Sequence, residues 1–278
     1  MKNSLTQVEM NILVGSILGD GNLALYGRSK NAYYREHGCD KQIDYRIWKS
    51  EKLKDLDFKF FPNHKHGKLC SPSHQIFTEL YNMFYINKIK TITEQNVKLL
   101  NHPIGLACFY MDDGTLIIDS AIRKNKVKYL FPRIALYSLS FSKEENIILL
   151  EHIKNTFNIE FKLKNRPDGK HYILELNKQN EITKFIDLMS QIVKEIPCMT
   201  YKINIQERLI AKQRQLELNN IQSVISSLHP NDTSYSSQEV NLLVQLKKSG
   251  VSNKDIATTL NRSYWSVVDK IRRLRIEG

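Results

Sequence analysis

Two segments of the chain repeat one pattern, an apolar helix with small residues that ends in Asp-Gly. The first spans residues 13–21 and the second residues 106–114, so Asp20 and Asp113 occupy matching positions. A carboxylate at the C-terminal end of a helix is disfavoured by roughly 0.3–1 kcal/mol, because it lies at the negative end of the helix dipole. A bound cation reverses that sign. Either segment alone is typical of an ordinary buried helix, but the matched pair predicts two carboxylates that meet at one site.

The helices that carry these carboxylates have recognisable starts. Residues 6–9, Thr-Gln-Val-Glu, fit the capping box, in which the Thr and Glu side chains satisfy free backbone N–H groups of the first turn. Pro103 follows Asn101 and His102, and proline is well tolerated in the first turn of a helix. We therefore expect helices that begin near residues 7 and 103.

Glycines and other small residues predict how these two helices end and pack. Gly21 and Gly114 are expected to take the left-handed conformation that closes a helix. Four small residues would let the helices lie side by side in the same direction, which brings both carboxylates to one place: Gly15, Gly19, Ala107 and Cys108.

The segments after each motif predict an α+β duplication. After the first motif we expect strands near 22–26 and 32–39, a helix near 43–56, strands near 58–60 and 67–72, and a helix near 75–87. After the second we expect strands near 115–119 and 131–139, a helix from Ser142, strands near 159–165 and 170–176 joined by a turn at 166–169, and a helix near 179–195. Each half is therefore predicted to have the order αββαββα, which makes the chain a pseudo-symmetric monomer with paired motif helices.

With these paired motifs the chain resembles the LAGLIDADG homing endonucleases, in particular the single-chain kind with two motifs. The matching motif residues are Leu13, Gly15, Ile17, Asp20 and Gly21, then Leu106, Ala107, Asp113 and Gly114. Segments 90–92 and 199–202 resemble those that carry the two active-site lysines of the family, here Lys90 and Lys202. The resemblance covers roughly residues 5–208.

The resemblance implies a sequence-specific endonuclease that hydrolyses both strands of DNA with a divalent metal. Asp20 and Asp113 would be the metal ligands and, with Lys90 and Lys202, the catalytic residues. Mg²⁺ is the implied cofactor, with Mn²⁺ as a substitute. Asp112 is turned by about 100° around the helix from Asp113 and is not expected to be a ligand.

Two other functions stay open on the sequence. One is a transcription regulator derived from this family that has lost cleavage, and the presence of both Asp20 and Asp113 argues against it. The other is an RNA-splicing maturase that binds host intron RNA, which the sequence does not exclude.

Each half is expected to present an antiparallel sheet to the major groove of double-stranded DNA, where base edges are distinguishable. The candidate contacts are the basic residues on the predicted strands and their connections: Arg28, Lys30, Arg35, Lys41, Arg123, Lys124, Lys126, Lys128 and Arg133. For each of them a solvated basic surface is the alternative.

Composition agrees with a nucleic-acid partner. The chain has 41 Lys and Arg against 29 Asp and Glu, a formal charge of +12 and a pI of about 9.4. No apolar run reaches the ~18–20 residues of a membrane span and no secretory segment precedes the first helix, so we expect an intracellular protein of the cytoplasm, nucleoid or an organelle matrix. A zinc site has candidate ligands but lacks a CxxC pair: His64, His66, Cys70 and His74.

The chain is expected to divide into repeats at 1–97 and 98–208, a linker at 209–232 and a three-helix domain at 233–278. In the last domain, helices are predicted from Ser236 to Gly250, from Asn253 to Leu260, and from a Ser263 cap to Leu274. This domain resembles the helix-turn-helix of Myb-like and resolvase-type modules, although such units also dock proteins. The resemblance implies DNA contacts from its third helix and the residue before it: Arg262, Tyr264, Trp265, Lys270, Arg272 and Arg273.

Overall fold

The computed structural model describes residues 5–25, 27, 29–122, 127–166, 168–225, 235–262 and 264–274. These residues fall into two compact units, one that ends at residue 225 and one that begins at residue 235. The predicted division between residues 97 and 98 stays a prediction, because both halves belong to the first unit. Among the described residues, no helix combines the length and the apolar character needed to cross a membrane.

The first half of the large unit follows the predicted order and adds one small hairpin. Its elements are α1 (Gln7–Leu18), β1 (Asn22–Leu25), β2 (Ala32–His37), α2 (Ile43–Lys52), β3 (Lys59–Phe61), β4 (Lys68–Cys70), α3 (Gln75–Phe84), β5 (Tyr85–Ile86) and β6 (Ile89–Lys90). The sheet has the order β1-β2-β4-β3 and all its pairings are antiparallel. The hairpin β5–β6 ends at Lys90, so it positions one of the predicted catalytic residues.

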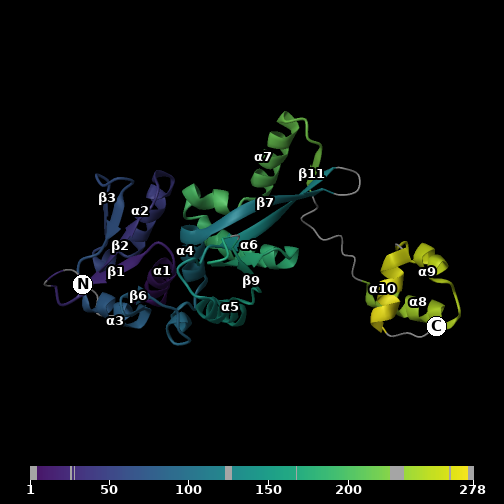
Figure 1. The fold of residues 1–278 in the computed structure, drawn as a ribbon, viewed down its shortest axis with the longest axis horizontal. Helices are drawn as coiled ribbons and strands as arrows, with labels where there is room; N and C mark the ends of the chain where they lie inside the picture. The colour runs from purple at the N-terminus through teal and green to yellow at the C-terminus, as the bar shows by residue number, and fades with distance from the viewer. Residues whose placement is uncertain are drawn as a thin grey trace. The chain divides into compact units, whose positions relative to one another are not determined.

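The second half repeats this order with longer strands. Its elements are α4 (Pro103–Asp113), β7 (Gly114–Ile122), β8 (Lys128–Leu136), α5 (Lys143–Phe157), β9 (Lys162–Asn165), β10 (Tyr172–Leu176), α6 (Gln179–Val193), and a 3-10 turn at Pro197–Lys202. The strand β8 pairs antiparallel with β7 and β10, and β9 completes the edge. In Figure 1, α1 and α4 lie between the two sheets. The α+β fold expected from the sequence is confirmed.

The predicted start and turn signals have the expected partners. The Thr6 hydroxyl accepts the Glu9 N–H, and the Glu9 carboxylate accepts the Thr6 N–H, as a capping box requires. His102 is the N-cap of α4 and Pro103 stands in its first turn. In the predicted hairpin turn, the Gly169 N–H donates to the Arg166 carbonyl at 2.9 Å. These three local predictions are confirmed.

The predicted linker at 209–232 is wrong for residues 209–225. They lie in α7 (Ile205–Leu218) and β11 (Ser223–Ile225), and β11 pairs in parallel with β8. The reason is that two leucines of the polar helix α7 are buried, Leu209 at 0% and Leu216 at 7% exposure. The rest of the predicted linker, residues 226–232, lies outside the described residues.

The small unit consists of three helices, as predicted. They are α8 (Ser237–Lys248), α9 (Asn253–Thr259) and α10 (Tyr264–Leu274). Their core contains Leu243, Ile256, Val267 and Ile271. Ser236 forms a capping box with Glu239 at the start of α8, whereas the predicted Ser263 cap lies outside the described residues. The helix-turn-helix identity of this unit stays a prediction.

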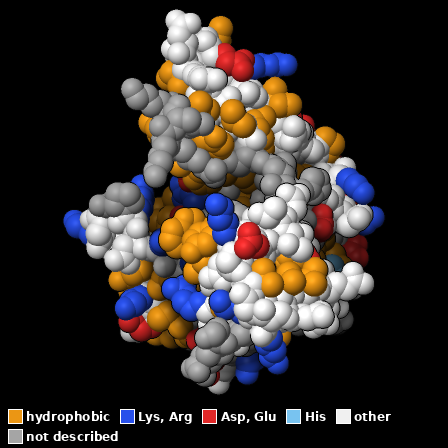
Figure 2. Space-filling model, turned by 90° about the vertical axis from the view of Figure 1, so that its right-hand side faces the viewer, with side chains coloured by type: hydrophobic (Ala, Val, Ile, Leu, Met, Phe, Trp, Pro, Cys, Tyr) orange, Lys and Arg blue, Asp and Glu red, His pale blue; other side chains and the backbone are white. Residues whose placement is uncertain are grey.

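Figure 2 shows one face of the molecule, on which Lys and Arg side chains are spread among hydrophobic ones instead of gathering in one patch. Within the described residues, no group of three or more His, Cys, Asp or Glu converges in a way that could hold a metal ion, so the four zinc candidates are not brought together.

Candidate functional site

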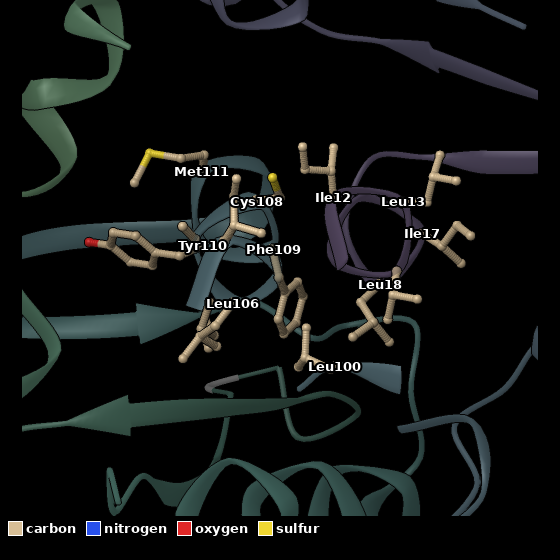
Figure 3. Close-up of a cluster of buried hydrophobic side chains, with 14 of the residues drawn as sticks. Ile12, Leu13, Ile17, Leu18, Leu100, Leu106, Cys108, Phe109, Tyr110 and Met111 are labelled. Atoms are coloured by element: carbon tan, nitrogen blue, oxygen red, sulfur yellow. The ribbon is translucent and has the colours of Figure 1, made fainter. Parts of the chain in front are cut away.

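The two motif helices form the centre of the large unit. Figure 3 shows α1 and α4 side by side, surrounded by the buried side chains that they carry. Ile12 and Leu13 of α1 and Phe109 and Tyr110 of α4 are all 0% exposed. A helix that is apolar on every side is a buried helix, which explains why neither segment has an amphipathic pattern. The site is therefore built on rigid elements.

Glycine allows these helices to approach backbone to backbone. A Cβ atom added to Gly15 would lie 2.0 Å from the carbonyl oxygen of Gly105, and one added to Gly19 would lie 2.5 Å from Cβ of Asp112. The predicted close approach is confirmed for Gly15 and Gly19. On α4, Gly15 lies against Gly105, just before the motif, and not against the predicted Ala107 or Cys108.

Hydrogen bonds at the start of the helices fix their direction. Asn11 Oδ1 accepts the backbone N–H groups of Asn101 and His102, both at 2.9 Å. The start of α1 thus contacts the start of α4, and the end of α1 contacts Asp112 near the end of α4. The helices are parallel, and their Asp-Gly ends lie together.

The prediction that Gly21 and Gly114 take the left-handed conformation is wrong. Gly114 is extended, with φ −90° and ψ 159°, and Gly21 has no positive φ. Packing explains why these positions are glycines. A Cβ on Gly21 would lie 2.5 Å from the Tyr34 hydroxyl oxygen, and one on Gly114 would lie 1.9 Å from Cδ2 of Tyr110.

The structure brings the two predicted carboxylates into electrostatic contact. Desolvation, and then the charge of Asp20, raise the pKa of Asp113 to about 6. The pKa of Asp20 is also raised, by desolvation from the protein around its carboxylate and by the charge of Glu36, although Asp20 itself is an exposed residue. Among the described residues, neither carboxylate has an ion-pair partner. Two desolvated acids that raise each other's free energy and form no direct ion pair fit a cation.

The two predicted lysines bind the ends of the two motif helices. Lys90 Nζ donates to the carbonyls of Gly19 at 3.0 Å and Gly21 at 2.9 Å. Lys202 Nζ donates to the carbonyls of Met111 and Asp112, the latter at 3.3 Å. Each ammonium group therefore satisfies carbonyl groups at the negative end of one helix dipole.

Both lysines also lie close enough to the carboxylates to interact with them. Desolvation lowers the pKa of Lys90 and of Lys202, and the charges of Asp20, Asp113 and Asp112 act in the opposite direction. All four predicted catalytic residues thus converge, from positions 20, 90, 113 and 202 of the sequence.

Asp112 is engaged elsewhere, in agreement with the expectation that it is not a ligand. Its two carboxylate oxygens lie 2.9 and 3.1 Å from Lys49 Nζ, and Lys49 is 0% exposed. Lys49 and its second partner, Glu36, were not among the residues predicted from the sequence. A usable signal was present, because Lys49 lies one turn after Tyr45 on the apolar side of α2, where a lysine needs a buried partner.

The predicted contacts of the first sheet lie on its open face or beside it. Arg35 is exposed on β2 and pairs in register with Asn22 of β1 and Cys70 of β4. Lys30 and Lys41 are exposed in the connections. The remaining candidate of this half, Arg28, lies outside the described residues.

In the second sheet, one predicted contact has internal partners and another has the opposite orientation. Arg133 Nε and Nη2 donate to the two Asp119 oxygens, and Nη1 donates to Glu175 Oε2 at 2.8 Å. These residues line a groove of about 560 Å³. Lys128 lies an odd number of residues from Arg133 on the same strand, so it faces the other side of the sheet. The other candidates lie outside the described residues: Arg123, Lys124 and Lys126.

Of the DNA contacts predicted in the small unit, some have partners within the protein and others are exposed. Arg262 forms an ion pair with Glu239 at 2.9 Å and lies 4.8 Å from the centre of the Tyr235 ring. Lys270 also lies over that ring, at 5.4 Å. The exposed candidates all stand on α10: Tyr264, Trp265, Arg272 and Arg273.

We expect Asp113→Asn to stabilise the free protein, measured without divalent metal. Because the pKa of Asp113 is about 6 in the folded protein and about 3.9 in an unfolded chain, the folded state binds this proton more tightly. The stability from this group is therefore lost as the pH rises from about 4 through about 6. At about pH 7.5 the variant should melt roughly 2–6 °C above the wild type, and near pH 4 the difference should vanish. Equal melting temperatures at the higher pH would contradict the electrostatic assignment.

Several known proteins are similar to this chain in sequence. The sequence model of the LAGLIDADG DNA endonuclease family matches residues 10–185. The chain is 25% identical over 221 residues to the DNA endonuclease I-ChuI of Chlamydomonas applanata, with 72% of this chain and 96% of that protein covered. It is 26% identical over 204 residues to the RecA protein of Mycolicibacterium flavescens, with 72% and 47% covered. The chain thus spans about half the length of the RecA relatives.

A solved structure shares the fold. The homing endonuclease I-WcaI bound to its DNA recognition sequence superposes with a TM-score of 0.58 at 23% sequence identity, over 73% of this chain and 88% of that one. The family match falls on the large unit, which also carries the four converging residues.

Proposed function

Because the chain belongs to the LAGLIDADG DNA endonuclease family, we propose that it is a homing endonuclease that cuts both strands of a specific DNA sequence by hydrolysing one phosphodiester bond in each. One observation carries the proposal: Asp20 and Asp113 converge at the ends of two parallel helices, and neither carboxylate forms an ion pair within the described part of the chain. The double pattern suits the two strands of a duplex, and we propose one protein molecule per target site.

Asp20 and Asp113 would hold the divalent metal. Carboxylate oxygens are the ligands that Mg²⁺ and Mn²⁺ prefer, and the two acids raise the free energy of the site until a cation neutralises them. When bound, the metal would lower the pKa of the attacking water and neutralise charge on the phosphate. Asp112 does not join this ligand pair, since Lys49 binds both of its oxygens.

Lys90 and Lys202 would place two positive charges beside the reacting phosphates. Their ammonium groups are held by main-chain carbonyls, so their position needs no reorganisation during the reaction. Fixed cations of this kind stabilise a phosphorane-like transition state more than the ground state. The open faces of the two sheets would lie in the major groove, with Arg35 and Arg133 among the contacts.

Cleavage of selected DNA tests the proposal. The full chain is incubated with a pool of randomised duplexes and Mg²⁺ or Mn²⁺, cut molecules are recovered, and a single target is identified. We expect double-strand cuts at one sequence, and none in the presence of EDTA. Specific binding without cleavage in either metal would instead support the regulator, and binding to intron RNA alone would support the maturase.

Arg133 is expected to read a guanine in that target. Its bonds to Asp119 and Glu175 use three of the five guanidinium N–H groups, and guanine is read by two donors, one to O6 and one to N7. We expect Arg133→Ala to relax the preference for one G·C pair by roughly 5–150-fold while cleavage persists. The measurement compares cleavage of targets substituted at each base pair, with Lys128→Ala as the control on the opposite face. A uniform loss at all positions would indicate a phosphate contact.

A further inference from the structure

A buried network of charges lies directly beneath the converging carboxylates. Lys49 Nζ is 2.9 Å from Glu36 Oε2 and 2.9 Å from Asp112 Oδ1, and the three side chains are 0%, 2% and 1% exposed. The Tyr34 hydroxyl donates to the same Glu36 oxygen at 2.5 Å. The Tyr45 ring lies against the ammonium group, 4.3 Å from its centre. One ammonium group therefore contacts both carboxylates of the network.

This network joins elements of both halves of the large unit. Glu36 belongs to β2 and Lys49 to α2 of the first half, whereas Asp112 belongs to α4 of the second. Buried ion pairs seldom add net stability, because desolvation of the charges offsets their attraction. Apolar residues would fill this space without that cost, so the network is better explained by the geometry that it fixes.

The network reaches Asp20 through Asp112. Asp112 Oδ2 accepts the backbone N–H of Asp20 at 3.4 Å, and the Asp112 side chain occupies the space where a Cβ on Gly19 would lie. The end of the first motif therefore rests on a carboxylate that Lys49 holds in place. A change in the position of Asp112 would move the main chain that carries Asp20.

Among the described residues, no side chain of the first motif accepts the backbone N–H of Asp113 as Asp112 accepts that of Asp20. In the first motif the position that matches Asp112 is Gly19, which has no side chain to offer to the second motif. The main chain of Asp113 is instead the last turn of α4, and its carbonyl accepts the Tyr137 N–H at 3.0 Å. The two carboxylates are thus positioned by different means.

We propose that Lys49, together with Glu36 and Asp112, is a positioning network that acts mainly on Asp20, and that it makes the two strand-cleaving halves of the site unequal. The inference rests on the proposed function. Loss of the network should disturb one cleavage event much more than the other, although the metal ligands and both active-site lysines remain.

The test measures the cleavage of each strand separately. The full-length Lys49→Met variant is given the target in two forms, a supercoiled plasmid and a linear duplex whose two strands carry different end labels. We expect one strand, the same in every molecule, to be cut roughly 10–100-fold more slowly, as a misplacement of about 1 Å can cause, so that nicked circles accumulate. Equal slowing of both strands, or no change in their ratio, would overturn the proposal.

Further variants separate positioning from folding. Tyr34→Phe removes only the hydrogen bond to Glu36 and keeps the ring that packs on Phe58, so it should shift the same strand ratio by a smaller factor. The matched control is Lys52→Ala, which changes another lysine of α2. It breaks only an exposed ion pair with Glu195 and should leave the ratio of the two cleavage rates unchanged. If the ratio of the two strand-cleavage rates in Tyr34→Phe equals that of the wild type, this result would count against the positioning role of the network. Failure of the wild type to cut either strand would overturn the proposed function instead.

Discussion

Replacing Asp20 or Asp113 with asparagine is expected to abolish double-strand cleavage and to leave specific DNA binding within about threefold of the wild type. Each change removes one metal ligand and no base contact. Loss of one group that acts directly on the transition state costs about 10²–10³-fold, and residues that act as a unit cost more, so we expect a rate at least ~10³-fold lower. Binding should survive because the open faces of both sheets are unchanged.

The measurement combines plasmid cleavage with binding in the same buffer. Asp187→Asn is the matched control, because it removes the same charge from an exposed position on α6 that has no part in the site. Wild-type cleavage by either variant would exclude the metal-ligand assignment. Nicked circles from the single variants, with opposite strands cut by the two, would show that each carboxylate serves its own strand.

The parts of this site that could be predicted from the sequence are those that depend on local patterns. The repeated Asp-Gly helix end located Asp20 and Asp113, and Thr6 and Pro103 located the helix starts. The lysines came from a resemblance, since nothing local marks Lys90 or Lys202 as different from the other lysines.

The features that the sequence did not predict depend on contacts between distant segments. Lys49 is explained only by carboxylates at positions 36 and 112, and Arg262 only by Glu239. A side chain at position 21 would clash with the Tyr34 hydroxyl group, so the need for Gly21 comes from this distant contact instead of the turn preference of glycine. For the same reason α7 was mistaken for a linker, because Leu209 and Leu216 acquire their role from a sheet formed by an earlier part of the chain.

This correction fixes where the small unit can be removed. A truncation after residue 225 keeps α7 and β11, which pack on β8, whereas a truncation at residue 208 would expose Leu130 and remove a strand from the sheet. The protein truncated after residue 225 should therefore retain the fold of the large unit, and with it all four proposed catalytic residues.

We expect the protein truncated after residue 225 to cut its target at an unchanged maximal rate but with a much lower affinity. If the small unit binds DNA, the chain makes its second contact intramolecular, which raises the overall affinity by about 10²–10⁴-fold. The slope of log affinity against log salt should fall by about 0.9 for each phosphate group that the truncated protein no longer neutralises, and the footprint should shorten at one end. Salt titrations of both proteins on one target measure this, with full-length Trp265→Ala and Arg273→Ala as variants of the exposed face of α10. An unchanged slope and footprint would mean that this face does not bind DNA, and that the exposed Trp265, at 72% exposure, belongs to a protein-docking surface instead.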